Sequence, residues 1–287
     1  MDILAEASGA TRSFGAFTAV SAVDLAVGRG EVVGLLGANG AGKTTLIRLL
    51  LGLLRPSYGA VRLFGAAPSI STRRRVGYVP QTLGLYAGLT VAENWSFTAA
   101  AFRTARAPVP EDISAWRNEL VGGLPLGAQR QVAFAVALSH QPELLILDEP
   151  TSGVGPLGAA RLWEQIRQAA EGGAGALVTT HNMEEAEQCD RLVMMAAGTV
   201  VASGTAAGII GDRKVTEVHC HDPGRAFAVL DANDVAVQMQ GAALRVGAPA
   251  AAVAGLVSRA GIDATVEMVP ANLEEAFVAI VGRPEAG

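Results

Sequence analysis

The run GANGAGKT at residues 37–44 constrains the fold of this chain more than any other segment. It fits the pattern G-x-x-x-x-G-K-[ST], and it follows the apolar run 31–36 and precedes the helical run 44–54. Glycines let successive backbone N–H groups approach a phosphate, and a helix that begins at Lys43 adds its positive dipole end. In a chain of this composition, a chance match has a probability on the order of one in three hundred. The segment therefore predicts a phosphate-binding loop in an α/β sheet.

Each residue type in this loop has a chemical role. Lys43 supplies a mobile positive charge for a γ-phosphate, and the Thr44 hydroxyl is a hard oxygen ligand suited to Mg²⁺. The alternative, a glycine-rich turn without a ligand, leaves unexplained why one of only two lysines lies here. The expected nucleotide-binding set is Gly37, Asn39, Gly40, Ala41, Gly42, Lys43, Thr44 and Thr45.

A second acidic element supports the same chemistry. The apolar strand expected at 144–147 delivers Asp148 and Glu149 to the carboxyl edge of a sheet, where α/β proteins bind ligands. Asp148 is placed to hold Mg²⁺, and Glu149 to take a proton from an attacking water as a general base. Alone, such a pair is a weak pattern, since carboxylates also cap helices that follow strands. The upstream phosphate-binding loop favours the functional interpretation.

The order of elements predicts two domains. Alternation over 20–27, the runs 31–36 and 144–147, and another strand at 176–180 indicate a sheet with buried parallel strands. Helices at 91–102 and 113–120, separated by breakers at 107–110, suggest a helical insertion at about 86–140. After residue 213, strands at 215–221, 235–240, 243–246 and 264–269 and helices at 250–260 and 273–281 predict a small α+β domain over 214–287.

Composition excludes several other classes. The net charge is −5, so nucleic acid is a poor candidate partner, and the cluster at 73–75 is better explained as a solvated surface or a local salt-bridge site. Two cysteines make no disulfide framework, and the first residues lack the pattern of a signal peptide, which favours a reducing cytoplasm. No apolar run approaches the ~20 residues of a membrane helix. Any membrane association is expected to come through another protein.

Three further motifs make roughly residues 1–210 resemble the ATPase subunit of ABC transporters: YVPQ at 78–81, LDEPTSG at 147–153 and TTHNMEEAE at 179–187. The resemblance implies an ABC ATPase domain over 1–213. The resemblance implies that ATP and Mg²⁺ are the cofactors. It makes Phe14 the aromatic that stacks on adenine, Gln81 a Mg²⁺ sensor linked to the membrane partner, and His181 the switch histidine near the γ-phosphate. It also implies a catalytic group of Lys43, Gln81, Glu149 and His181, and a metal set of Thr44, Gln81 and Asp148.

The resemblance also implies partners and a location. The chain is expected to work as a homodimer or heterodimer on a separate permease, peripheral to the cytoplasmic face of the membrane. The segments 124–127, 151–154 and 269–277 resemble the drug-exporter branch with ABC-2-type permeases.

The chain departs from the family pattern in three places. The signature Leu-Ser-Gly-Gly-Gln corresponds to LPLGA at 124–128, and the loop after Glu149 reads SGVGP at 152–156 without the usual aspartate. Pro125 removes a backbone donor, and Leu126 cannot approach a phosphate as glycine does. The interval between Gln81 and Leu124 is also short, which predicts a shortened helical subdomain. Because the signature serves the opposite subunit's ATP, we expect a slow homodimer and a more active heterodimer.

Other interpretations remain open. They are a non-transport ABC ATPase, a poorly hydrolysing regulatory half of a heterodimer, and a P-loop kinase or GTPase. Gln81 and His181 disfavour the kinase, and no guanine-reading segment supports the GTPase. His219 and His221 on one strand face invite a metal interpretation, but two histidines without further spaced ligands are more typical of a polar strand face.

Overall fold

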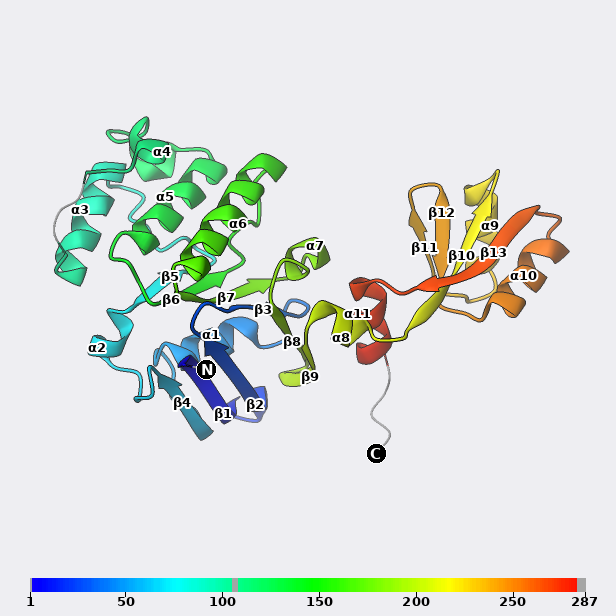
Figure 1. The fold of residues 1–287 in the computed structure, drawn as a ribbon, viewed down its shortest axis with the longest axis horizontal. Coiled ribbons are helices and arrows are strands. Elements are labelled where there is room, and N and C mark those ends of the chain that lie inside the picture. Colours follow the sequence, from blue (N-terminus) through cyan, green and yellow to red (C-terminus); the bar gives the residue numbers. More distant parts are fainter. Residues whose placement is uncertain (1, 105–107, 283–287) are drawn as a thin grey trace. The chain divides into compact units, whose positions relative to one another are not determined.

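The computed structural model describes residues 2–104 and 108–282, which form two compact units (Figure 1). One unit ends at Thr205 and the other begins at Ala206. Ala107, one of the predicted breaker residues, lies outside the described residues. In the described part of the chain, no helix combines the length and apolar character needed to cross a bilayer.

A six-stranded sheet forms the centre of the first unit, in the order β5-β6-β7-β3-β8-β9. The apolar runs become β3 (Val32–Leu36), β6 (Leu144–Asp148) and β7 (Gly175–Thr180), and each is buried along its whole length. They pair in parallel with one another, which confirms the buried parallel strands. The sheet is completed by β5 (Val76–Val79), β8 (Arg191–Ala196) and β9 (Thr199–Gly204).

A second, antiparallel sheet joins β1 (Ile3–Phe14), β2 (Phe17–Gly28) and β4 (Tyr58–Leu63). Its buried side chains share one core with residues of β3 and α1 (Lys43–Leu50). Helix α1 is shorter than the predicted 44–54, because Gly52 adopts the left-handed conformation, φ +66°, that ends helices. Helix α1 begins after the carboxyl end of β3, at the sheet edge where the parallel strands β6 and β7 also end.

Helix α2 (Ile70–Arg73) precedes β5. The helical region that follows β5 contains α3 (Val91–Phe102), α4 (Glu111–Ser114), a 3₁₀ turn (Val121–Gly123) and α5 (Leu126–Leu138). Figure 1 shows α3, α4 and α5 grouped together, away from β1, β2 and β4. The prediction of a helix over 113–120 is wrong, because the carbonyls of Arg117 and Glu119 instead accept the first N–H groups of α3. The unit also includes α6 (Pro156–Glu171) and α7 (Met183–Ala186).

The second unit is an α+β arrangement around a four-stranded antiparallel sheet in the order β11-β12-β10-β13. Its strands are β10 (Lys214–Cys220), β11 (Val237–Gln240), β12 (Ala243–Val246) and β13 (Ala264–Pro270). Its helices are α8 (Ala206–Ile210), α9 (Pro223–Asp231), α10 (Ala250–Arg259) and α11 (Leu273–Val281). Because α8 packs against α11, residues 206–213 group with this unit.

Candidate nucleotide site

The loop between β3 and α1 packs closely against β2 at Gly42. Gly42 precedes the first turn of α1 with φ +102°, in the left-handed region that favours glycine. A Cβ placed on Gly42 would lie 2.5 Å from the Ala19 carbonyl oxygen, so a side chain has no room there. Glycine at this position leaves the loop backbone free to approach a phosphate, as a phosphate-binding loop requires.

The side chain of Lys43 folds back into this loop. It is 5% exposed, and its Nζ donates hydrogen bonds to the carbonyl oxygens of Gly37 at 2.6 Å and Ala38 at 3.2 Å. Burial lowers the pKa of Lys43, and the nearby negative charges of Glu149 and Asp148 oppose that shift. An anion bound in the loop would offer the ammonium group a charged acceptor in place of two neutral ones.

Asp148 lies at the end of β6, facing the start of α1. Its Oδ2 accepts a hydrogen bond from Thr44 Oγ1 at 3.0 Å, and its Oδ1 accepts one from Thr179 Oγ1 at 2.7 Å. Asp148 is 2% exposed, so its carboxylate is fixed by these two hydroxyls. A carboxylate and a hydroxyl oxygen at this separation are the hard donors that Mg²⁺ prefers, and the residues present fit such an ion.

Glu149 meets two predicted partners. Its Oε2 accepts a hydrogen bond from Gln81 Nε2 at 3.4 Å, and its Oε1 lies 3.5 Å from His181 Nδ1. Glu149 adopts φ +52°, an uncommon backbone conformation for a residue with a side chain. Its N–H donates to Thr179 Oγ1 at 2.9 Å, which ties the residue to β7. The structure thus brings Gln81, Glu149 and His181 together from three separate segments.

A cavity of about 410 Å³ opens over the loop. Glu149 and Gln81 form part of its wall, and so does Phe17 of β2. Phe14, the predicted adenine contact, does not line it, although Phe14 and Phe17 are register partners across the hairpin that joins β1 and β2. Phe14 is 45% exposed, and the Arg12 guanidinium carbon lies 4.5 Å from its ring centroid. The remaining lining residues are Ala19, Asn39, Gly40, Ala41, Gly42, Lys43, Thr44 and Thr45.

Sequence reasoning missed the residues that support this site from behind. Thr179 links Asp148 and Glu149, and the Glu185 carboxylate accepts hydrogen bonds from Thr151 and Thr180. Arg130 of α5 donates to the Glu149 carbonyl oxygen at 2.8 Å. The only available indication was the polar end of an otherwise apolar strand at Thr179 and Thr180.

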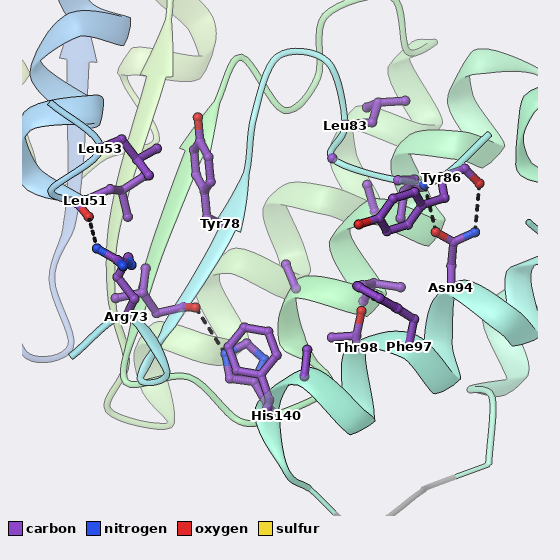
Figure 2. Close-up of a pocket in the computed structure, with 18 residues that line it drawn as sticks. Leu51, Leu53, Arg73, Tyr78, Leu83, Tyr86, Asn94, Phe97, Thr98 and His140 are labelled. Carbon is purple, nitrogen blue, oxygen red and sulfur yellow. Dashed lines mark hydrogen bonds between the residues drawn. The ribbon is translucent and has the colours of Figure 1, made fainter. Parts of the chain in front are cut away.

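A second cavity, of about 330 Å³, lies beside the segment that follows Gln81 (Figure 2). Tyr86 and Phe97 meet edge to face on one side, with ring centroids 4.9 Å apart, and they are 52% and 50% exposed. Figure 2 shows Leu53 and Tyr78 on the other side. Asn94 fixes the segment, because it accepts from the Tyr86 N–H and donates to the Tyr86 carbonyl.

The histidines of the second unit do not act together. His219 lies with Glu217 and Glu267, and ligand atoms of the three lie within 4.8 Å of one another, while His221 falls beyond the end of β10. Glu217 already pairs with His219 Nε2 at 2.6 Å and with Arg245 Nη1 at 2.9 Å. The positive charge of Arg245 opposes a divalent cation at this place. The cluster is explained by ion pairing on the strand face.

Comparison with known proteins extends these observations. The family model described as "ABC transporter" matches residues 20–152. "Probable multidrug ABC transporter ATP-binding protein YbhF" of Escherichia coli is 40% identical over 212 residues, which cover 70% of this chain but only 37% of that protein. "Nod factor export ATP-binding protein I" of Mesorhizobium japonicum is 33% identical over 96% of this chain and 86% of its own length.

A solved structure shows the same fold. A protein described as "Structure of ATP binding subunit of ABC transporter" aligns with a TM-score of 0.68 and 32% identity, over 72% of this chain and 91% of its own. The phosphate-binding loop, the Asp148–Thr44 pair and the Glu149 contacts thus belong to a fold in which such subunits are found. The chain is a member of the family of ABC-transporter ATP-binding proteins.

Proposed function

We propose that this chain hydrolyses Mg²⁺-bound ATP and that the hydrolysis drives export through a separate permease. The observation that carries the proposal is Glu149, whose carboxylate lines the cavity over the phosphate-binding loop beside Lys43. A carboxylate there can accept the proton of a water that attacks the γ-phosphorus. A bond then forms between the water oxygen and phosphorus, and the bond to the ADP oxygen breaks.

The other site residues prepare this step. The loop N–H groups and Lys43 hold the β- and γ-phosphates, and this requires Lys43 to leave its two carbonyl acceptors. Thr44 and Asp148, with Gln81, would hold Mg²⁺, which supplies a positive charge for the phosphate oxygens. His181, whose Nδ1 lies 3.5 Å from Glu149 Oε1, would contact the γ-phosphate. Phe14 or its cross-strand neighbour Phe17 offers a ring to adenine.

The export assignment rests on the relatives and on the cavity of Figure 2. YbhF is named for multidrug transport and the Nod factor protein for export. We infer the direction of export for this chain from these relatives and propose no particular substrate. The cavity, with exposed Tyr86 and Phe97, is lined in part by the chain segment that follows Gln81. Because Gln81 donates a hydrogen bond to Glu149, a permease segment docked in this cavity would be linked to Glu149 through Gln81. We propose an ABC-2-type permease, which would hold the chain at the cytoplasmic face of the membrane.

The altered signature bears on the partner subunit. Pro125 and Leu126 replace groups that would contact the opposite nucleotide, whereas this chain's own phosphate-binding loop is complete. We therefore propose that pairing with a second ATPase that carries an intact signature speeds hydrolysis at this chain's site, and that a homodimer turns over slowly. We also propose that the helical subdomain is shortened, since its helix α4 has only four residues.

ATP turnover of the purified chain, followed with ³²P-labelled ATP over hours, tests the proposal. Glu149→Gln should lower the rate by roughly 10²- to 10⁴-fold, because the general base is lost. Glu171→Gln, at an exposed position at the end of α6, is the matched control and should leave the rate unchanged. Equal rates for wild type and Glu149→Gln would remove the catalytic role of Glu149.

A further inference from the structure

Helix α5 begins at the altered signature and carries a buried arginine to the catalytic loop. Arg130 lies on the second turn of α5 and is 6% exposed. Its Nη1 donates hydrogen bonds to the carbonyl oxygens of Glu149 at 2.8 Å and Pro150 at 3.3 Å. These contacts are to backbone, so the arginine acts on the path of the chain and not on the Glu149 carboxylate.

The burial of this cation is costly and incompletely compensated. Among the described residues, Arg130 Nε is a buried nitrogen without a hydrogen-bond partner. Burial lowers the pKa of Arg130, and the negative charge of Glu149 opposes the shift. A neutral side chain of similar length would avoid both costs. A requirement for the guanidinium at this position explains why the cost is tolerated.

The requirement follows from the backbone of Glu149. Its φ of +52° is strained for a residue with a side chain and persists only when its surroundings hold it. Thr179 holds its N–H and Arg130 holds its carbonyl, so both peptide groups that flank the Glu149 Cα are fixed, one from β7 and one from α5. This conformation turns the carboxylate toward Gln81 and His181.

A second contact from α5 reaches the same loop. Gly153 has φ +75°, and a Cβ placed on it would lie 2.6 Å from Leu126 Cδ2, so the leucine rests on the Gly153 backbone. Leu126 is one of the residues that replace the family signature. The start of α5 and its second turn therefore both contact the segment 149–153.

We propose that Arg130 is a positioning residue that holds the Glu149 backbone in its left-handed conformation and thereby couples the position of α5 to the general base. The inference rests on the proposed function, since it gives Glu149 a catalytic role. A displacement of α5, whose first residues occupy the signature position, would change the Glu149 backbone through this guanidinium.

ATP turnover and nucleotide binding of the full chain test the proposal. Arg130→Met should lower kcat by about 10- to 100-fold, as expected for a misplaced catalytic group, while KM for ATP and the Kd for a fluorescent ATP analogue change by less than about twofold. Arg130→Lys retains a positively charged donor group and should recover part of the rate. Arg161→Met, at an exposed position on α6, is the matched control.

A double variant separates positioning from general damage. If Arg130 acts through Glu149, Arg130→Met should not slow the residual turnover of Glu149→Gln further. An equal fractional loss in both backgrounds, or wild-type kcat in Arg130→Met and Arg130→Lys, would overturn the proposal. Should Arg130→Met fail to fold, Arg130→Lys and Arg130→Gln carry the same comparison. Failure of the proposed function looks different, because Glu149→Gln itself would then have no effect.

Discussion

Thr179 offers a sharp test of the hydrogen bonds behind the site, because valine has nearly the same shape and carries a methyl group in place of the hydroxyl. Thr179 is fully buried, its Oγ1 donates to Asp148 Oδ1 at 2.7 Å, and it accepts from the Glu149 N–H at 2.9 Å. Thr179→Val removes a hydrogen bond to a charged group, worth about 1.5–3 kcal/mol, and leaves a buried N–H unpaired, which costs about 1–3 kcal/mol. The added methyl offsets part of this, so we expect a destabilisation of about 2–4 kcal/mol.

Denaturant unfolding of the full chain measures this change. Circular dichroism and the tryptophan fluorescence of Trp95, Trp116 and Trp163, all in the first unit, report on the relevant part of the chain. Thr179→Ser keeps the hydroxyl and loses one methyl, and it should cost about 1 kcal/mol. The reasoning is refuted if valine is within about 0.5 kcal/mol of wild type, or if serine is as destabilising as valine.

Three further outcomes follow from the structure. The Arg75 and Arg29 guanidiniums lower the pKa of Glu143 to about 2 from 4.5, so its stabilising contribution is complete above pH 4.5 and is lost as the pH falls toward 2. Over this window the free energy of unfolding of wild type should approach that of Glu143→Gln. The stabilisation lost should be less than about 1 kcal/mol, because the Glu143 side chain is 34% exposed. Phe17→Ala should weaken ATP binding at least as much as Phe14→Ala in titrations with a fluorescent analogue, because Phe17 lines the cavity; unchanged binding in both would exclude ring stacking. Restoring the serine and the glycine of the signature with Pro125→Ser and Leu126→Gly should raise homodimer turnover about tenfold or more, and an unchanged rate would contradict the proposed asymmetry.

The local motifs could be predicted because each depends on a short stretch of chain. The phosphate-binding loop follows a strand and begins a helix as its glycine spacing predicts, and α3, β12 and α11 have the predicted bounds. The start of α9 could also have been found, since Asp222 caps it and Pro223 occupies its first turn.

The supporting residues could not be predicted, because their roles depend on register and packing. Thr179 touches Asp148 because β6 and β7 pair in parallel with those two residues as neighbours. Arg130 reaches Glu149 only through the packing of α5 against the loop. The turn at 115–119 reads locally as a helix, yet its carbonyls pair with the N-terminus of α3, and no single segment contains that information.

Titration calorimetry of Mg²⁺-ATP binding to the Glu149→Gln chain, with and without Lys43→Ala, tests the central claim most directly. Glu149→Gln prevents turnover during the titration, and the lysine change removes the ammonium group that folds into the loop. We expect saturable binding at one site per chain, weakened at least about tenfold by Lys43→Ala, since one charged contact is worth about 1.4 kcal/mol or more. An absence of nucleotide binding, or equal affinity in both proteins, would contradict the account.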